Sequence, residues 1–205
     1  ILRPHIPSFI LLIKKEGSPK LVRLAEELGK MNEEGFDAIL QSYWRKKALD
    51  TTKNRALSFF AKAFLQPYAE YLSDMRGKPE DGLAESVSLC PLCGGRPQVG
   101  CLRQADNGSR LSLVCSLCLA EWNFHRLSCV ACGKGCNGKF PYYTTEDYPH
   151  IRLDVCDNCG RYIKTVDVSK DPEAVPVVDE LATIPIDIWA RQQGYEKIED
   201  NVLGI

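Results

Sequence analysis

The stretch CPLCGGRPQVGCLRQADNGSRLSLVCSLC, residues 90–118, is the most informative part of this chain. It begins and ends with a Cys-x-x-Cys motif, and residues 94–114 separate the two motifs. Such a motif turns two thiolates toward one metal ion and aims backbone N–H groups at their sulfur atoms. Two motifs joined by a hairpin of this length predict a rubredoxin-like or zinc-ribbon-like module with four cysteine ligands.

The same arrangement occurs a second time, in CVACG at 129–133 and CDNCG at 156–160. The step from Cys90 to Cys129 nearly equals the step from Cys115 to Cys156, so two similar units in tandem are expected. Because short loops close most easily, we predict that each metal ion is bound within one unit. The first site is then Cys90, Cys93, Cys115 and Cys118, and the second is Cys129, Cys132, Cys156 and Cys159. Interleaved ligation is the alternative.

The turns that close the motifs differ in one position. Glycine follows the second cysteine in three of the four motifs, where it permits a left-handed backbone conformation. Leu119 follows Cys118 instead. The fourth turn is therefore expected to be strained or to close in another way.

Other uses of these cysteines fit the pattern less well. A single Cys-x-x-Cys motif would leave a thiol–disulfide site open, and iron–sulfur clusters use more closely grouped cysteines. Cys101 and Cys136 lie outside the repeat and are expected to be packed or free thiols. His125 and His150 could replace a ligand, but eight cysteines already fill two tetrahedral sites, and His5 has no partner nearby. Four thiolates suit zinc and iron alike, so the identity of the two ions stays open.

The sequence contains no pattern of a catalytic site. A metal closed off by four thiolates has no open position for a substrate, which disfavours metal-catalysed hydrolysis. A nucleophile elbow, a phosphate-binding glycine loop and a dinucleotide fingerprint are also missing. We therefore predict that the protein is not an enzyme.

The whole sequence predicts an α+β protein. Apolar residues at helical spacing indicate a helical N-terminal domain over residues 1–80, followed by a polar linker at 81–89. Three helices are expected in this domain: one begins at Ser18-Pro19, the second carries the apolar residues of 36–44, and the third begins near Asp50 or Thr51. The two cysteine modules then occupy 90–125 and 126–168, and an acidic helical segment occupies 169–205. Its helix is expected to begin at Asp171-Pro172, an N-cap followed by proline. Pro176 and Pro185 argue against one straight helix there.

Composition and charge exclude several classes of protein. The formal net charge is −1, and residues 90–168 carry nine basic and seven acidic side chains, which argues against a nucleic-acid-binding ribbon. The longest apolar run, Phe9–Ile13, is too short to cross a bilayer and has no cleavage site of a signal peptide after it. Ten cysteines without an export signal favour metal ligation in a reducing compartment over disulfides. We expect a cytoplasmic protein without membrane insertion.

Several strings of residues resemble the FdhE family of formate dehydrogenase accessory proteins. They are CPLCGGRP at 90–97, CSLC at 115–118 with Glu121-Trp122, CDNCGRYIK at 156–164, and the tail motifs KDPE at 170–173, DELA at 179–182 and GY at 194–195. The resemblance covers about Cys90 to Leu203. Its tail motifs have no connection with metal binding, which makes it specific. Ala120, where threonine is expected before Glu-Trp, and Pro185 depart from the family pattern.

The resemblance implies a cytoplasmic assembly factor with rubredoxin-like metal sites, for which iron has been proposed. Such a protein binds the catalytic subunit of a respiratory formate dehydrogenase, a molybdenum or tungsten enzyme, before export. A rubredoxin-like redox protein or sulfur carrier acting on that enzyme is the alternative. The residues that match the family but have no ligating role are candidates for partner binding, with Asp179 and Glu180 expected on a polar helix face. They are Glu121, Trp122, Tyr162, Lys164, Asp179 and Glu180.

Overall fold

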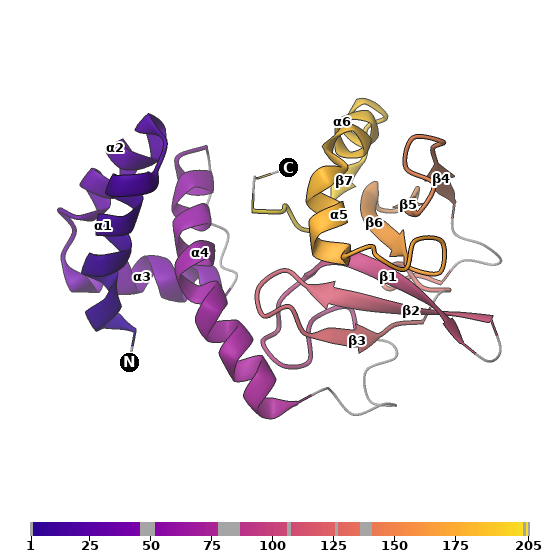
Figure 1. Ribbon diagram of the computed structural model, residues 1–205, viewed down its shortest axis with the longest axis horizontal. Coiled ribbons are helices and arrows are strands. Elements are labelled where there is room, and N and C mark those ends of the chain that lie inside the picture. The colour runs from indigo at the N-terminus through magenta and orange to yellow at the C-terminus, as the bar shows by residue number, and fades with distance from the viewer. Residues whose placement is uncertain are drawn as a thin grey trace. The chain divides into compact units, whose positions relative to one another are not determined.

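A computed structural model of the chain is shown in Figure 1, and it describes residues 2–45, 52–77, 87–105, 108–125, 127–135, 141–202 and 204. Contacts divide the chain into two compact units, Ile1–Gln66 and Pro67–Ile205. Most of the predicted linker, residues 81–86, lies outside the described residues. Within the described part of the chain, no helix is both long and apolar enough to cross a bilayer.

The first unit is helical, as the spacing of apolar residues predicted. Its elements are the 3-10 turn η1 (Arg3–His5) and the helices α1 (Ile6–Glu16), α2 (Pro19–Leu28), α3 (Glu33–Trp44) and the first part of α4 (Thr52–Arg76). The sequence predicted α2, α3 and α4 but not α1. Helix α1 packs Phe9 against Phe60 and Phe64 of α4, with ring centroids 6.3 and 5.2 Å apart. Aromatic packing therefore forms the core of this unit.

The second unit is built on one mixed sheet. Its strands are β1 (Pro97–Ala105), β2 (Gly108–Cys115), β3 (Glu121–Asn123), β4 (Tyr142–Thr144), β5 (Ile151–Cys156), β6 (Arg161–Asp167) and β7 (Glu196–Lys197). The strand order is β3-β2-β1-β6-β5-β4, and β7 pairs with β6. Each cysteine module contributes an antiparallel hairpin, β1–β2 or β5–β6. The α+β prediction with two tandem modules is confirmed, and the two hairpins share a single sheet.

The two hairpins are joined by parallel pairing of β1 with β6, in which Gly100 lies opposite Thr165. A Cβ atom at Gly100 would lie 2.5 Å from the Thr165 Oγ1 and 3.3 Å from its Cβ. The Thr165 hydroxyl is held in place because it donates to Asp154 Oδ2 at 2.6 Å. A glycine is therefore needed at position 100 for the two modules to come together.

We expect Gly100→Ala to lower the free energy of unfolding by about 1–3 kcal/mol, because the added methyl group overpacks the joint. The change can be measured by denaturant unfolding. Gly135→Ala is the matched control, since a Cβ there meets its nearest atom at an ordinary 3.7 Å. Combining Gly100→Ala with Thr165→Ala should recover part of the loss, and equal effects of Gly100→Ala and Gly135→Ala would contradict the account of the joint.

Two short helices, α5 (Pro176–Ala182) and α6 (Ile184–Gln192), lie over one face of the sheet (Figure 1). Their apolar side chains Val177, Ile186 and Ala190 pack on residues of the sheet, which are Val99, Ile151, Leu153, Val155, Tyr162 and Val166. The second unit thus consists of a helix layer over a sheet, with its core between them.

The start of this helical segment differs from the prediction. Asp171 does not cap a helix that begins at Pro172; its carboxylate accepts the N–H of Glu173 at 3.0 Å in a local turn. Helix α5 begins instead at Pro176, and Pro185 lies in the first turn of α6. Because proline fits the first turn of a helix but not its interior, α5 begins at Pro176 and Pro185 begins a separate helix, so the segment is not one straight helix, as the two prolines predicted.

Candidate metal centres

The first cysteine cluster lies where β1 begins and β2 ends. The Sγ atoms of Cys90 and Cys118 are 3.5 Å apart, and those of Cys93 and Cys115 are 3.4 Å apart. All four sulfur atoms lie within 4.8 Å of one another. Three of these cysteines are buried and Cys93 is half-buried. The structure therefore groups these sulfurs as the tandem repeat predicted.

The second cluster lies at the end of β5 and the start of β6. The Sγ atoms of Cys129 and Cys159 are 3.8 Å apart, and those of Cys132 and Cys156 are 3.9 Å apart. These four atoms also lie within 4.8 Å of one another. Cys129 and Cys156 are buried, Cys159 is half-buried and Cys132 is exposed. The grouping is again sequential rather than interleaved.

Both clusters have the dimensions of a tetrahedral thiolate site. A metal–sulfur distance of about 2.3 Å places the sulfurs of a regular tetrahedron about 3.8 Å apart, close to the observed 3.4–3.9 Å. Backbone N–H groups donate to the sulfurs, as from Gly95 to Cys93 at 3.3 Å and from Ala131 to Cys129 at 3.3 Å. The described cysteines are all free thiols. The residues therefore fit one four-coordinate ion at each cluster.

Crowding of the thiols sets their acidity. Contact with the Cys118 thiol, together with burial, raises the pKa of Cys115, and burial raises the pKa of Cys129. At the exposed edge the backbone N–H of Lys134 lowers the pKa of Cys132 to about 7. Four thiolates this close repel one another, so all of them can ionise together only beside a compensating cation.

The turns of the motifs explain the glycine pattern. Gly94, Gly133 and Gly160 have φ angles of +71°, +69° and +67°, which a side chain disfavours. Leu119 adopts the same left-handed conformation, with φ of +53°, and is the only described non-glycine residue with a positive φ. The Cys115 N–H still donates to the carbonyl of Ala120, at 2.9 Å, as in a regular knuckle. The fourth turn therefore closes in the same way, with strain.

We expect Leu119→Gly to raise the free energy of unfolding by up to about 1 kcal/mol, because glycine removes the left-handed strain of roughly 1–2 kcal/mol while the half-buried side chain loses some packing. Thermal unfolding of the metal-loaded protein measures the change. Leu117→Gly is the control: Leu117 is 5% exposed and has no positive φ, so its replacement should destabilise. Destabilisation by Leu119→Gly of similar size would contradict the strain.

Comparison with known proteins decides the family. A model of the FdhE central domain matches residues 89–126, and a model of the FdhE C-terminal domain matches residues 127–203, so that together they match more than half of the chain. This chain belongs to the FdhE family. The matched residues contain both four-cysteine clusters.

Relatives of this FdhE-family chain agree with the assignment. It is 28% identical to an FdhE homologue of Aquifex aeolicus over 94% of its length, and 26% identical to FdhE of Escherichia coli over 95%. It spans slightly less than two thirds of the length of these relatives, 66% and 62%. The crystal structure of the FdhE protein from Pseudomonas aeruginosa matches 98% of the chain and 70% of its own, with a TM-score of 0.78 at 25% identity.

Cys101, His125 and His150 are part of neither cluster. Cys101 is 0% exposed on β1, where it faces Val166 across the joint. Cys136 is outside the described residues. His150 lies 3.1 Å from Asp179, and the exposed His125 accepts from the N–H of Leu127. In the described part of the chain, only the two groups of cysteines bring three or more metal-binding side chains together.

Four of the six residues expected to bind a partner are buried. Trp122 is 3% exposed, and its indole N–H donates to the carbonyl of Val87 at 2.9 Å. Tyr162, Lys164 and Glu180 are each 0% exposed. The prediction of a polar, exposed helix face at Glu180 is wrong, because α5 turns this side chain toward the sheet. Burial removes these four side chains from direct contact with another protein in this conformation.

The other two residues remain partly exposed. The carboxylate of Asp179 is bonded within its own surroundings, since it contacts His150 and accepts the N–H of Val175 at 2.6 Å. Glu121 lies on the edge strand β3 with its side chain 36% exposed, paired with Arg103. Glu121 is therefore the most accessible of the six candidates.

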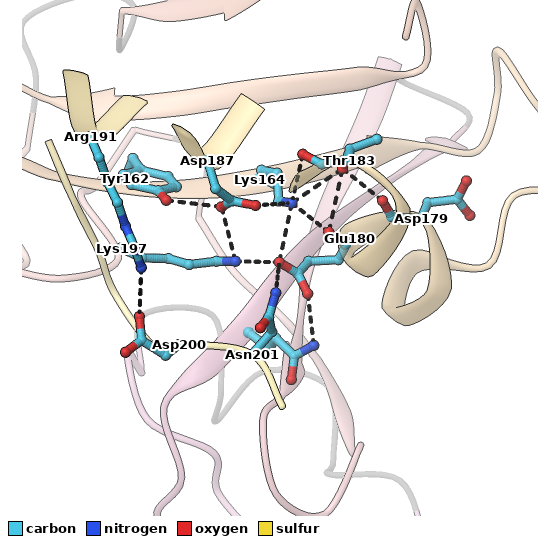
Figure 2. A network of polar contacts seen from close by, with 11 residues as sticks. Tyr162, Lys164, Asp179, Glu180, Thr183, Asp187, Arg191, Lys197, Asp200 and Asn201 are labelled. Carbon is cyan, nitrogen blue, oxygen red and sulfur yellow. Dashed lines mark hydrogen bonds and ion pairs between the residues drawn. The ribbon is translucent and has the colours of Figure 1, made fainter. Parts of the chain in front are cut away.

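The buried residues form a charged network that joins α5 and α6 to β6 and β7 (Figure 2). Lys164 contacts Glu180 at 3.2 Å and Asp187 at 2.5 Å, and Lys197 contacts the same two carboxylates. The Tyr162 hydroxyl donates to Asp187 at 2.9 Å, and burial raises its pKa. Two lysines balance two carboxylates, so the network is neutral as a whole. Sequence reasoning missed Asp187 and Lys197, because isolated charged residues usually lie in solvent.

Proposed function

We propose that this chain is a non-catalytic, metal-binding accessory protein that assists the assembly of a formate dehydrogenase. It binds the catalytic subunit of that enzyme in the cytoplasm before export. The observation that carries the proposal is the pair of four-cysteine clusters within the residues matched by the FdhE central and C-terminal models.

Membership of the FdhE family and the chemistry of the clusters support this role. Each cluster offers four sulfur ligands to one ion, either zinc or iron, so no coordination position is left for a substrate. An ion bound at a cluster would join its two Cys-x-x-Cys knuckles through metal–sulfur bonds. Four cysteines would hold each ion, and the backbone N–H groups at the knuckles delocalise the negative charge of the thiolates.

A second candidate is a rubredoxin-like redox protein or sulfur carrier acting on the same enzyme. The exposed Cys132 of the second cluster favours it, because electron transfer and sulfur transfer both require an accessible sulfur. Iron content with a reversible change in the visible spectrum on reduction supports this candidate. Colourless protein loaded with zinc that binds the catalytic subunit supports the accessory role.

The direct test is binding of the formate dehydrogenase catalytic subunit to the purified, metal-loaded chain, with metal analysis of the same sample. We expect Glu121→Lys to weaken this binding several-fold, because reversal of an exposed charge mainly slows encounter and alters specificity. Glu196→Lys is the matched control. The side chain of Glu196 is 78% exposed and is also paired with an arginine, Arg161, but it lies on β7, which pairs with β6 and not with the β2–β3 edge that carries Glu121.

Unchanged melting temperature and metal content in both variants would separate loss of binding from loss of folding. If Glu121→Lys and Glu196→Lys bind equally well, the partner surface does not include Glu121. If the unaltered chain fails to bind the catalytic subunit, the assembly role itself is refuted.

A further inference from the structure

The first cluster is mostly closed to solvent. Cys90, Cys115 and Cys118 are 2%, 0% and 3% exposed, and Cys93 is half-buried. The backbone at Gly95 runs so close to the sulfurs that an added Cβ would lie 2.7 Å from the Cys115 Sγ and 3.0 Å from the Cys93 Sγ. An incoming ligand atom has no room on this side of the cluster.

The second cluster has an open edge. Cys132 is exposed and Cys159 is half-buried, while the other two cysteines are buried. A small donor molecule can therefore approach the sulfur of Cys132 from solvent.

Two side chains hold the exposed sulfur in place. The amide of Asn158 donates to the Cys132 Sγ at 3.6 Å, and the ammonium of Lys134 donates to the Asn158 Oδ1 at 3.1 Å. Lys134 comes from one knuckle of the second cluster and Asn158 from the other. The pair thus connects both knuckles across the open edge and places a positive charge near the thiolates, an arrangement that orients a ligand and stabilises its charge.

We propose that the second centre is the exchangeable one, and that Cys132 is the ligand at which exchange begins. An incoming soft donor, such as a thiolate or a chelating nitrogen, forms a bond to the ion while the bond from the ion to the Cys132 sulfur breaks. The released thiolate takes up a proton from water, and no electron is transferred. Asn158 and Lys134 slow this step, and the first centre keeps its ion as part of the fold.

The inference rests on the proposed binding of one ion by each cluster and deepens it. It assigns the two centres different tasks. The first stabilises the β1–β2 hairpin, and the second can exchange its ion with a thiol-rich partner. The class of partner that fits is a protein or small molecule presenting an unhindered thiolate, since soft donors compete best for a thiolate-bound ion.

The test is the release of zinc from the loaded chain to an excess of the chromophoric chelator 4-(2-pyridylazo)resorcinol. We expect two phases of one ion each, with rates that differ roughly tenfold or more. Cys132→Ser should lose the fast phase. Cys93→Ser should begin with one ion fewer and keep the fast phase.

Surface variants separate control of exchange from folding. Asn158→Ala and Lys134→Ala should speed the fast phase by about threefold to tenfold and leave the slow phase unchanged. Lys170→Ala is the control, because this exposed lysine contacts the carbonyl of Pro149 at the end of the β5–β6 hairpin opposite the cluster. Melting temperatures close to that of the unaltered chain would show that the variants fold.

Two ions released at one rate, or a fast phase that survives Cys132→Ser, would overturn the inference while leaving metal binding intact. Fewer than two ions in the starting protein would instead refute the proposed ligation on which the inference rests. Binding of the formate dehydrogenase subunit is a separate measurement, so its failure would not affect the difference between the two centres.

Discussion

Cys90→Ser and Cys156→Ser should each remove one of the two expected metal ions and unfold the hairpin that carries the ligand. Cys90 is 2% exposed and Cys156 is 5% exposed, so neither position can be filled by water from solvent without opening the knuckle. A structural ion bound by four cysteines contributes on the order of 10 kcal/mol to folding. This is comparable with the whole stability of a domain, about 5–15 kcal/mol.

Elemental analysis per chain and thermal unfolding measure the effect. Cys101→Ala is the matched control, because this buried cysteine lies outside both clusters and its replacement should leave two ions in place. Cys93→Ser combined with Cys118→Ser should remove one ion, since both sulfurs belong to the first cluster. Loss of both ions in that double variant would mean that the ligand sets are interleaved, contrary to the grouping of the sulfurs.

Glu180→Gln is expected to lower the free energy of unfolding by about 3–5 kcal/mol, because it leaves an uncompensated charge in a buried network. Glu180 balances Lys164 and Lys197, and all three side chains are 0% or 1% exposed. It also accepts from Gln98 at 3.0 Å. Burial already lowers the pKa of Lys164, so a cation there depends strongly on its carboxylate partners. Denaturant unfolding of the metal-loaded chain measures the loss.

Two comparisons show whether the loss comes from buried charge. Asp200→Asn breaks the Arg191–Asp200 pair, whose side chains are 41% and 45% exposed, and should cost less than about 1 kcal/mol. Lys164→Met combined with Glu180→Leu removes one charge of each sign, so the double variant should be more stable than Glu180→Gln alone. A loss of under about 1 kcal/mol in Glu180→Gln would contradict the role of the network.

Several features of the fold could be read from short segments of sequence. The Cys-x-x-Cys spacing, the tandem offsets and the glycines at 94, 133 and 160 are local signals, because each knuckle closes through bonds between residues at most five positions apart. Helix α2 followed from the same kind of signal, a cap residue before proline and apolar residues at helical spacing, and α3 followed from the spacing alone. Helix α1 was missed because its apolar run also reads as a short buried segment.

The burial of the charged residues could not be predicted from such local signals. Glu180 and Lys164 each look like solvated charges, since a carboxylate on a helix or an ammonium on a strand usually faces water. Their burial depends on the packing of α5 and α6 against β6. It also depends on the contact of Glu180 with Lys197, which lies far beyond Lys164 in the sequence. The expectation that Glu180 is accessible failed for this reason.

The α+β class, the eight clustered cysteines and the left-handed turns could be predicted from the sequence, because their causes lie within a few residues or within one repeat. Three other features depend on how distant segments pack: the two hairpins share one sheet through Gly100 and Thr165, α5 and α6 bury a neutral network, and Cys132 is exposed while Cys115 is not. These features depend on which distant surfaces exclude water from one another. That exclusion comes from the packing of whole elements, and no local pattern of residues encodes it.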